Sequence, residues 1–130
     1  MKRHFLGLLC ALATAGALAQ GAAYPAKPIK FVVPFSPGSA TDIVARAVGE
    51  VMGRSMGQSI VIENKLGAGG TIAAAQVARS EPDGYTILVH SSGHALNPAL
   101  YPNPGYDTLK DLTGITTLAA IPNVLVVNPS

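Results

Sequence analysis

Three short apolar runs recur along the chain, and each is followed by a loop rich in glycine, proline or serine. The runs are residues 31–33, 60–62 and 87–89. Their β-branched and aromatic residues favour strands, and their continuous apolar character is typical of strands covered on both faces. Stretches with helical character separate them. The order β-α-β-α-β predicts an α/β fold, with a parallel sheet, right-handed crossovers and flanking helices.

The first helix is predicted over residues 40–56 and should end at Gly57. Apolar side chains recur there at spacings of three and four, so we expect one buried face made of Ile43, Ala47, Val48, Val51 and Met52. The second helix is predicted over residues 71–80. Its alanine-rich composition indicates close packing on the sheet.

The alternation of apolar strand-like runs with helical stretches becomes less regular after Pro98. Residues 107–112 favour a short turn or helix, whereas residues 115–121 and 123–127 are strand-like and are divided by Pro122. The last run, 124–127, is strongly apolar and has little sequence after it to cover it. We therefore expect the chain to hold an incomplete domain.

The first residues predict a secretory signal peptide over residues 1–23. Lys2, Arg3 and His4 form a charged start, an apolar stretch follows to residue 18, and small residues allow cleavage after Ala19 or Ala23. The stretch is too short to span a membrane. Residues 24–130 would then be the exported part, a partial first α/β domain.

Charge and cysteine content exclude several classes of function. Lys2 and Arg3 account for two of the nine basic side chains, so seven remain to balance seven acidic ones. No basic patch favours nucleic acid. The single cysteine, Cys10, lies in the predicted signal peptide, so the exported part would have no disulfide.

Loops that follow parallel strands meet at one edge of the sheet, which is where open α/β sheets bind ligands. In the first loop Ser39 lies three residues before Asp42, a spacing close to a capping box. The helix start there would present backbone N–H groups to an anion. The glycine loop at 67–71 either presents further N–H groups or is only a turn that needs positive φ and close packing, and both interpretations stay open.

Other chemistry is weakly supported. The glycine loop lacks the third glycine and the Gly-Lys-Ser/Thr of nucleotide loops, so we expect no cofactor. His90 and His94 have no carboxylate or cysteine nearby in the sequence, so we expect no metal. Gly-x-Ser-x-Gly is absent, so we expect no enzyme; a hydrolase using Ser91 or Ser92 with His94 is the lesser alternative.

Four segments together carry a family resemblance: residues 34–42, 62–70, 82–86 and 123–130. The chain resembles the Bug extracytoplasmic solute receptors, the substrate-binding proteins of tripartite tricarboxylate transporters. The resemblance implies a periplasmic two-domain clamshell, here expected as a monomer, that closes on a small carboxylate and delivers it to membrane permease subunits.

The resemblance and the sheet-edge argument point to the same three loops for this domain's half of the cleft. The candidate ligand contacts are Ser36, Gly38, Ser39, Thr41, Asp42, Gly69, Gly70, Thr71, Ser91, Ser92, His94 and Asn97.

Two features depart from the family pattern. Ser39 stands where the family usually has the second glycine of a pair, and it could narrow the approach or add a hydroxyl contact. The chain is also much shorter than the roughly three hundred residues of a typical two-domain member. The resemblance therefore implies a truncated receptor that lacks its second domain and binds carboxylates weakly or not at all. A non-binding remnant or an interaction module is the alternative.

Overall fold

The structure, a computed structural model, describes residues 23–122 and 124–128. The predicted signal peptide lies outside the described residues except for Ala23. Three parallel strands form one sheet in the order β2-β1-β3. The strands are β1 (Ile29–Val33), β2 (Ile60–Asn64) and β3 (Thr86–Leu88), and the helices that link them are α2 (Ala40–Met56) and α3 (Thr71–Ala78). The predicted α/β fold with a parallel β-α-β-α-β order is confirmed.

Strand β1 lies in the centre because both of its edges are paired. Phe31 is opposite Ile62 on β2 and opposite Ile87 on β3. The carboxyl ends of all three strands therefore point the same way, and the loops that follow them leave the sheet at one edge. This register confirms the arrangement that the sequence predicts for the three loops.

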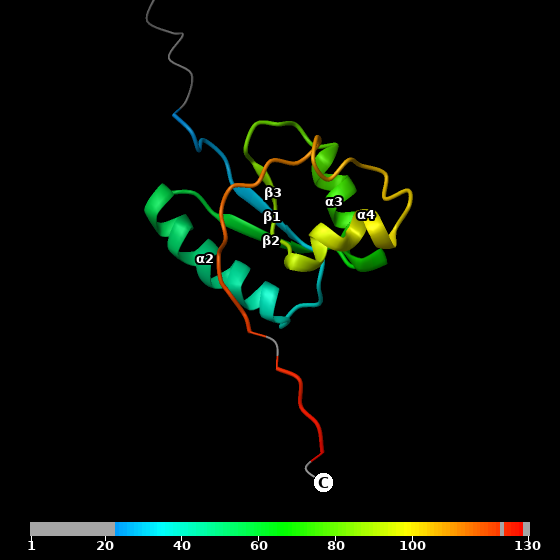
Figure 1. Cartoon of the computed structure of the whole chain (residues 1–130). Coiled ribbons are helices and arrows are strands. Elements are labelled where there is room, and N and C mark those ends of the chain that lie inside the picture. The colour runs from blue at the N-terminus through cyan, green and yellow to red at the C-terminus, as the bar shows by residue number, and fades with distance from the viewer. Residues whose placement is uncertain (1–22, 123, 129–130) are drawn as a thin grey trace, which may run out of the picture.

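The two helices cover opposite faces of the sheet (Figure 1). Ile29, Phe31 and Val33 form the core beneath α2, together with Ala45 of that helix. Val32 points to the other face and packs with Ala73 and Val77 of α3. This alternation follows from the period of two along a strand, and it explains why β1 is apolar throughout.

Helix α2 has the predicted bounds, with Ser39 as N-cap and Gly57 as C-cap at φ 66°. Its predicted buried face is wrong in part. Ile43 and Val51 are each 59% exposed, whereas Ala45 and Gly49 are buried.

Close approach of helix and strand explains the difference. A Cβ at Gly49 would lie 3.1 Å from Cγ2 of Ile60 on β2, tighter than ordinary contact. Small residues therefore face the sheet, and the bulkier side chains on the neighbouring positions turn outward.

The second and third loops contain short helices that the sequence pattern did not predict. In the third loop a 3₁₀ turn, η2 (Ser92–Leu96), leads directly into α4 (Asn97–Leu100). In the glycine loop a 3₁₀ turn, η1 (Ala68–Gly70), precedes α3. Residues 107–111 form the expected turn, closed by the Lys110 and Asp111 amides on the Asp107 carbonyl.

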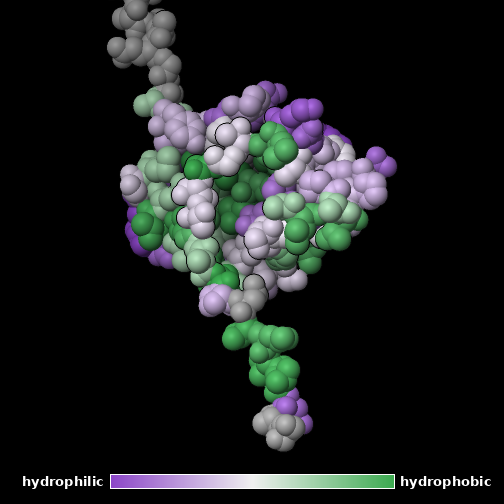
Figure 2. Space-filling model, in the orientation of Figure 1, coloured by the Kyte–Doolittle hydropathy of each residue, from purple (hydrophilic) through white to green (hydrophobic). Residues whose placement is uncertain are grey.

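The two predicted C-terminal strands are not formed. Residues 115–122 and 124–128 contain no strand, and Leu125 is 94% exposed. Figure 1 shows this segment passing across the fold and then leading away from it, and Figure 2 shows its apolar surface. A strand needs a partner for its backbone hydrogen bonds, and no described strand pairs with these residues.

Within the described residues, no helix combines the length and the apolar character that crossing a membrane requires.

Candidate functional site

The first loop, residues 34–39, joins β1 to α2 through a reciprocal set of capping bonds. The Asp42 backbone N–H donates to Oγ of Ser39 over 3.3 Å, and the Gly38 N–H donates to Oδ2 of Asp42 over 2.8 Å. This confirms the predicted capping relation between Ser39 and Asp42. Ser39 has φ −65°, an ordinary backbone conformation, so a serine fits there without strain.

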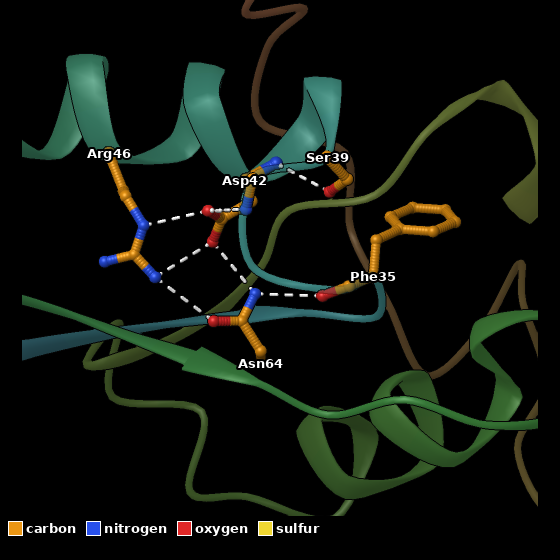
Figure 3. A network of polar contacts seen from close by, with 6 residues as sticks. Phe35, Ser39, Asp42, Arg46 and Asn64 are labelled. Carbon is orange, nitrogen blue, oxygen red and sulfur yellow. Dashed lines mark hydrogen bonds and ion pairs between the residues drawn. The ribbon is translucent and has the colours of Figure 1, made fainter.

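The Asp42 carboxylate is buried, at 2% exposure, and is surrounded by donors (Figure 3). Besides the Gly38 amide, Arg46 donates from Nε over 2.9 Å and from Nη2 over 3.0 Å. Nδ2 of Asn64 donates over 2.8 Å. The Arg46 guanidinium, the Gly38 amide and the Asn64 amide together hold the pKa of Asp42 far below its ordinary value of 3.8.

Asn64 joins this carboxylate to the first loop, and the sequence reasoning did not single it out. It is the last residue of β2, and its Nδ2 also donates to the Phe35 carbonyl over 2.9 Å. Its Oδ1 accepts from Nη2 of Arg46 over 3.1 Å. Only the adjacency of β1 and β2 brings Asn64 to this place, so no local pattern would have revealed it.

The glycine loop is packed tightly between its two neighbours. Gly70 is buried at φ 92°, and a Cβ there would lie 2.2 Å from Nε2 of His90 and 3.0 Å from Cβ of Pro34. A Cβ at Gly69 would lie 2.7 Å from the Tyr101 hydroxyl. Both glycines are thus required by positive φ and by close packing. Thr71 is buried and its hydroxyl donates to the Ala68 carbonyl over 3.0 Å.

Four aromatic rings contact one another in series along the third loop. His90 meets Phe35 edge-on with ring centres 5.4 Å apart, and lies 5.0 Å from the ring of His94. His94 stacks on Tyr106 at 5.8 Å. Burial lowers the pKa of both histidines, and for His90 the neighbouring His94 adds to the effect. Both imidazoles are therefore held in the neutral form at neutral pH.

Asn97 ties the third loop to the glycine loop. It is 2% exposed, and its Nδ2 lies 3.4 Å from both the Gly69 carbonyl and the Tyr106 hydroxyl. Nδ1 of His90 lies 3.1 Å from the Ser91 carbonyl, while its Nε2 is buried without a hydrogen-bond partner among the described residues.

The structure brings all twelve predicted contacts to the carboxyl edge of the sheet, but in different environments. Five are exposed: Ser36, Gly38, Gly69, Ser91 and Ser92. Three are half-buried: Ser39, Thr41 and His94. Four are buried in contacts within the protein: Asp42, Gly70, Thr71 and Asn97.

The site is an open edge. Two hollows lie elsewhere, one between α2 and β2 and one beside residues 98–109, and neither is lined by a predicted contact. No cluster of three or more His, Cys, Asp or Glu side chains that could hold a metal ion occurs within residues 23–122 and 124–128.

Comparison with known proteins decides the family. The family described as "Tripartite tricarboxylate transporter family receptor" matches residues 44–130. The chain belongs to this receptor family. The resemblance to Bug receptors is thereby confirmed, and the family is one of solute receptors.

Individual relatives agree with this assignment. The protein BugT of Bordetella pertussis (strain Tohama I) is 43% identical over 122 residues, which cover 91% of this chain and 37% of BugT. The solved periplasmic binding protein BugD is 50% identical with a TM-score of 0.65, over 68% of this chain and 29% of BugD. MatC of Rhodopseudomonas palustris, solved with bound malate, is 42% identical with a TM-score of 0.61, over 68% of this chain and 30% of MatC. The chain thus spans little more than a third of the length of BugT and a smaller share of the solved structures.

Proposed function

We propose that this chain forms one wall of a carboxylate-binding cleft in a periplasmic receptor, which passes its solute to the permease of a tripartite tricarboxylate-type transporter. The proposal is supported most directly by the convergence of three loops at one sheet edge in a chain of this receptor family. The malate bound by MatC gives the class of ligand.

The chemistry of the loops suits an anion that is held without an arginine. Arg46, the arginine nearest the first loop, is occupied by Asp42. The exposed serine hydroxyls of the loops, at Ser36, Ser91 and Ser92, are neutral, and the exposed cation of the second loop is Lys65. Neutral donors in fixed positions, together with the N-terminal end of α2, bind carboxylates effectively because they carry no large desolvation cost.

The arrangement of the third loop does not favour a hydrolase. Nδ1 of His94 lies 3.5 Å from the Tyr106 hydroxyl, and among the described residues no hydrogen bond joins the His94 imidazole to the hydroxyl of Ser91 or Ser92; only the His94 backbone N–H bonds to the Ser91 carbonyl. A nucleophilic serine needs a base within hydrogen-bond reach.

Titration with L-malate, followed by amide NMR, tests the proposal. We expect shifts confined to residues 36–39, 69–71 and 91–92, and we expect none with dimethyl malate, which has the same skeleton without the charges. Ser36→Ala and Ser92→Ala should weaken the response, whereas Ser55→Ala, at an exposed position of α2, should not. Equal shifts with malate and its ester, or shifts centred on the hollow between α2 and β2, would refute a carboxylate site at this edge.

A further inference from the structure

We propose that Asn64 is a positioning residue that fixes the shape of the first loop, and that Asp42 and Arg46 support the same loop rather than contact the ligand. The importance of this for ligand binding rests on the proposed function, whereas the positioning itself does not. Figure 3 shows Asn64 facing α2 and the first loop from the end of β2.

The side-chain amide of Asn64 has only one orientation that satisfies its neighbours. Arg46 can only donate, so it requires the Oδ1 of Asn64 on its side, 3.1 Å away. The Phe35 carbonyl and Oδ1 of Asp42 can only accept, so they require Nδ2, at 2.9 Å and 2.8 Å. The ion pair therefore sets the direction in which Asn64 donates.

Two bonds pin the two ends of the turn that the ligand would meet. At one end the Phe35 carbonyl accepts from Asn64, and at the other the Gly38 N–H donates to Asp42. Residues 36 and 37 between them are exposed. With both ends held, the turn loses its freedom before a ligand arrives, which lowers the entropy that binding must overcome.

The Asp42 carboxylate has little capacity left for a ligand. Four donor atoms surround it, from Gly38, Arg46 and Asn64, and its side chain is 2% exposed. A carboxylate offers about four lone-pair sites, so its acceptors are filled. We therefore assign Asp42, which the sequence suggested as a ligand contact, to the support of the loop.

The pinned turn also sets the position of the third loop. Phe35 packs edge-on against His90, and His90 in turn closes over Gly70. A substitution of Asn64 should therefore loosen residues 35–39 most and His90 next, and should affect the core between the sheet and α3 least.

Amide hydrogen exchange of the full chain tests this without any ligand. Asn64→Asp keeps the shape, removes both Nδ2 bonds and places a second carboxylate beside that of Asp42. We expect the protection of the Gly38 amide to fall by about tenfold, since both changes loosen the same turn. The backbone amides of Val32 and Val77, which belong to the core between the sheet and α3, should keep their protection. Arg46→Lys retains the charge but loses the second donor, and it should loosen the loop less. Arg54→Gln, in the exposed Glu50–Arg54 pair of the same helix, is the matched control and should change nothing at Gly38.

Two results would overturn the inference. Unchanged exchange at Gly38 in both Asn64→Asp and Arg46→Lys would show that the network does not hold the turn. Equal losses of protection at Gly38, Val32 and Val77 would show a general stabilising role only. Malate titration of the same variants forms a separate arm: if the unaltered chain shows no malate response, the proposed function fails while the exchange result still decides the positioning role.

Discussion

Gly70 offers the sharpest test of how the three loops fit together, through comparison of Gly70→Ala with Gly38→Ala. Both glycines have positive φ, 92° at Gly70 and 83° at Gly38, so alanine is strained at either position. Their surroundings differ. A Cβ at Gly38 has nothing within 4 Å, whereas one at Gly70 would lie 2.2 Å from Nε2 of His90 and 3.0 Å from Cβ of Pro34.

The size of each effect follows from these contacts. Left-handed backbone costs an ordinary residue about 1–2 kcal/mol, and this is the whole expected effect of Gly38→Ala. At Gly70 overpacking adds roughly 1–3 kcal/mol, because the side chain of His90 and the ring of Pro34 must both move. We therefore expect Gly70→Ala to destabilise the chain by about 2–5 kcal/mol, a large part of the 5–15 kcal/mol that is typical of a small domain.

Urea unfolding followed by circular dichroism measures both variants, with the slope checked to confirm that only stability has changed. The double variant Gly70→Ala/His90→Ala removes the shortest contact, and a double-mutant cycle should show a favourable coupling of at least about 0.5 kcal/mol. Equal destabilisation by Gly70→Ala and Gly38→Ala, together with no coupling to His90, would refute the tight packing of the loops.

Three further predictions concern the cap, the histidines and the buried carboxylate. Ser39→Ala should lower the free energy of unfolding by about 1 kcal/mol and Ser39→Gly by only a few tenths, by thermal unfolding; equal losses would argue against a capping role. Because burial lowers the pKa of His90 and His94 below 6.5, the unfolded chain gains protons first, so stability should fall as pH drops below about 6.5. Urea midpoints at pH 7.5 and 5.5 should show this loss, and a loss of the same size in His90→Gln would contradict a contribution from His90. The pKa of Asp42 is depressed in the folded state, so its contribution is complete above the unfolded value near 3.8 and is lost as pH falls below it. Asp42→Asn should therefore be less stable than the unaltered chain at pH 6 and closer to it at pH 2.5, and a constant gap at both pH values would be the contrary result.

Local features of the first half of the chain were predictable because short-range physics decides them. The apolar runs at β1 and β2 are strands because β-branched side chains pack well on a pleated sheet. Helix α2 begins at a serine cap and ends at Gly57 with φ 66°, both of which are signals that lie within a few residues of the helix ends. The convergence of the three loops was also predictable from the sequence, because the carboxyl ends of parallel strands lie at the same edge of a sheet.

Predictions failed where long-range contacts compete with local pattern. The apolar spacing of Ile43 and Val51 indicated a buried face, but Gly49 lets α2 approach β2 so closely that Ala45 and Gly49 take the inner positions. The strand-like residues 124–127 have the right composition, yet a strand exists only when a neighbour accepts its backbone hydrogen bonds.

Patterns within the sequence were enough to predict the α/β class, the order of helices and strands, and the family resemblance. The contacts that each side chain of the candidate site makes depend on the fold. The strand order β2-β1-β3 places Asn64 beside Asp42, and the two residues are 22 positions apart in the chain. Once they meet, the Asp42 carboxylate at the start of α2 is buried among donors, whereas the hydroxyl-bearing residues Ser36, Ser91 and Ser92 stay exposed. The reason is physical: a buried carboxylate must fill its acceptors, and the donors that fill it come from parts of the chain that only folding brings together.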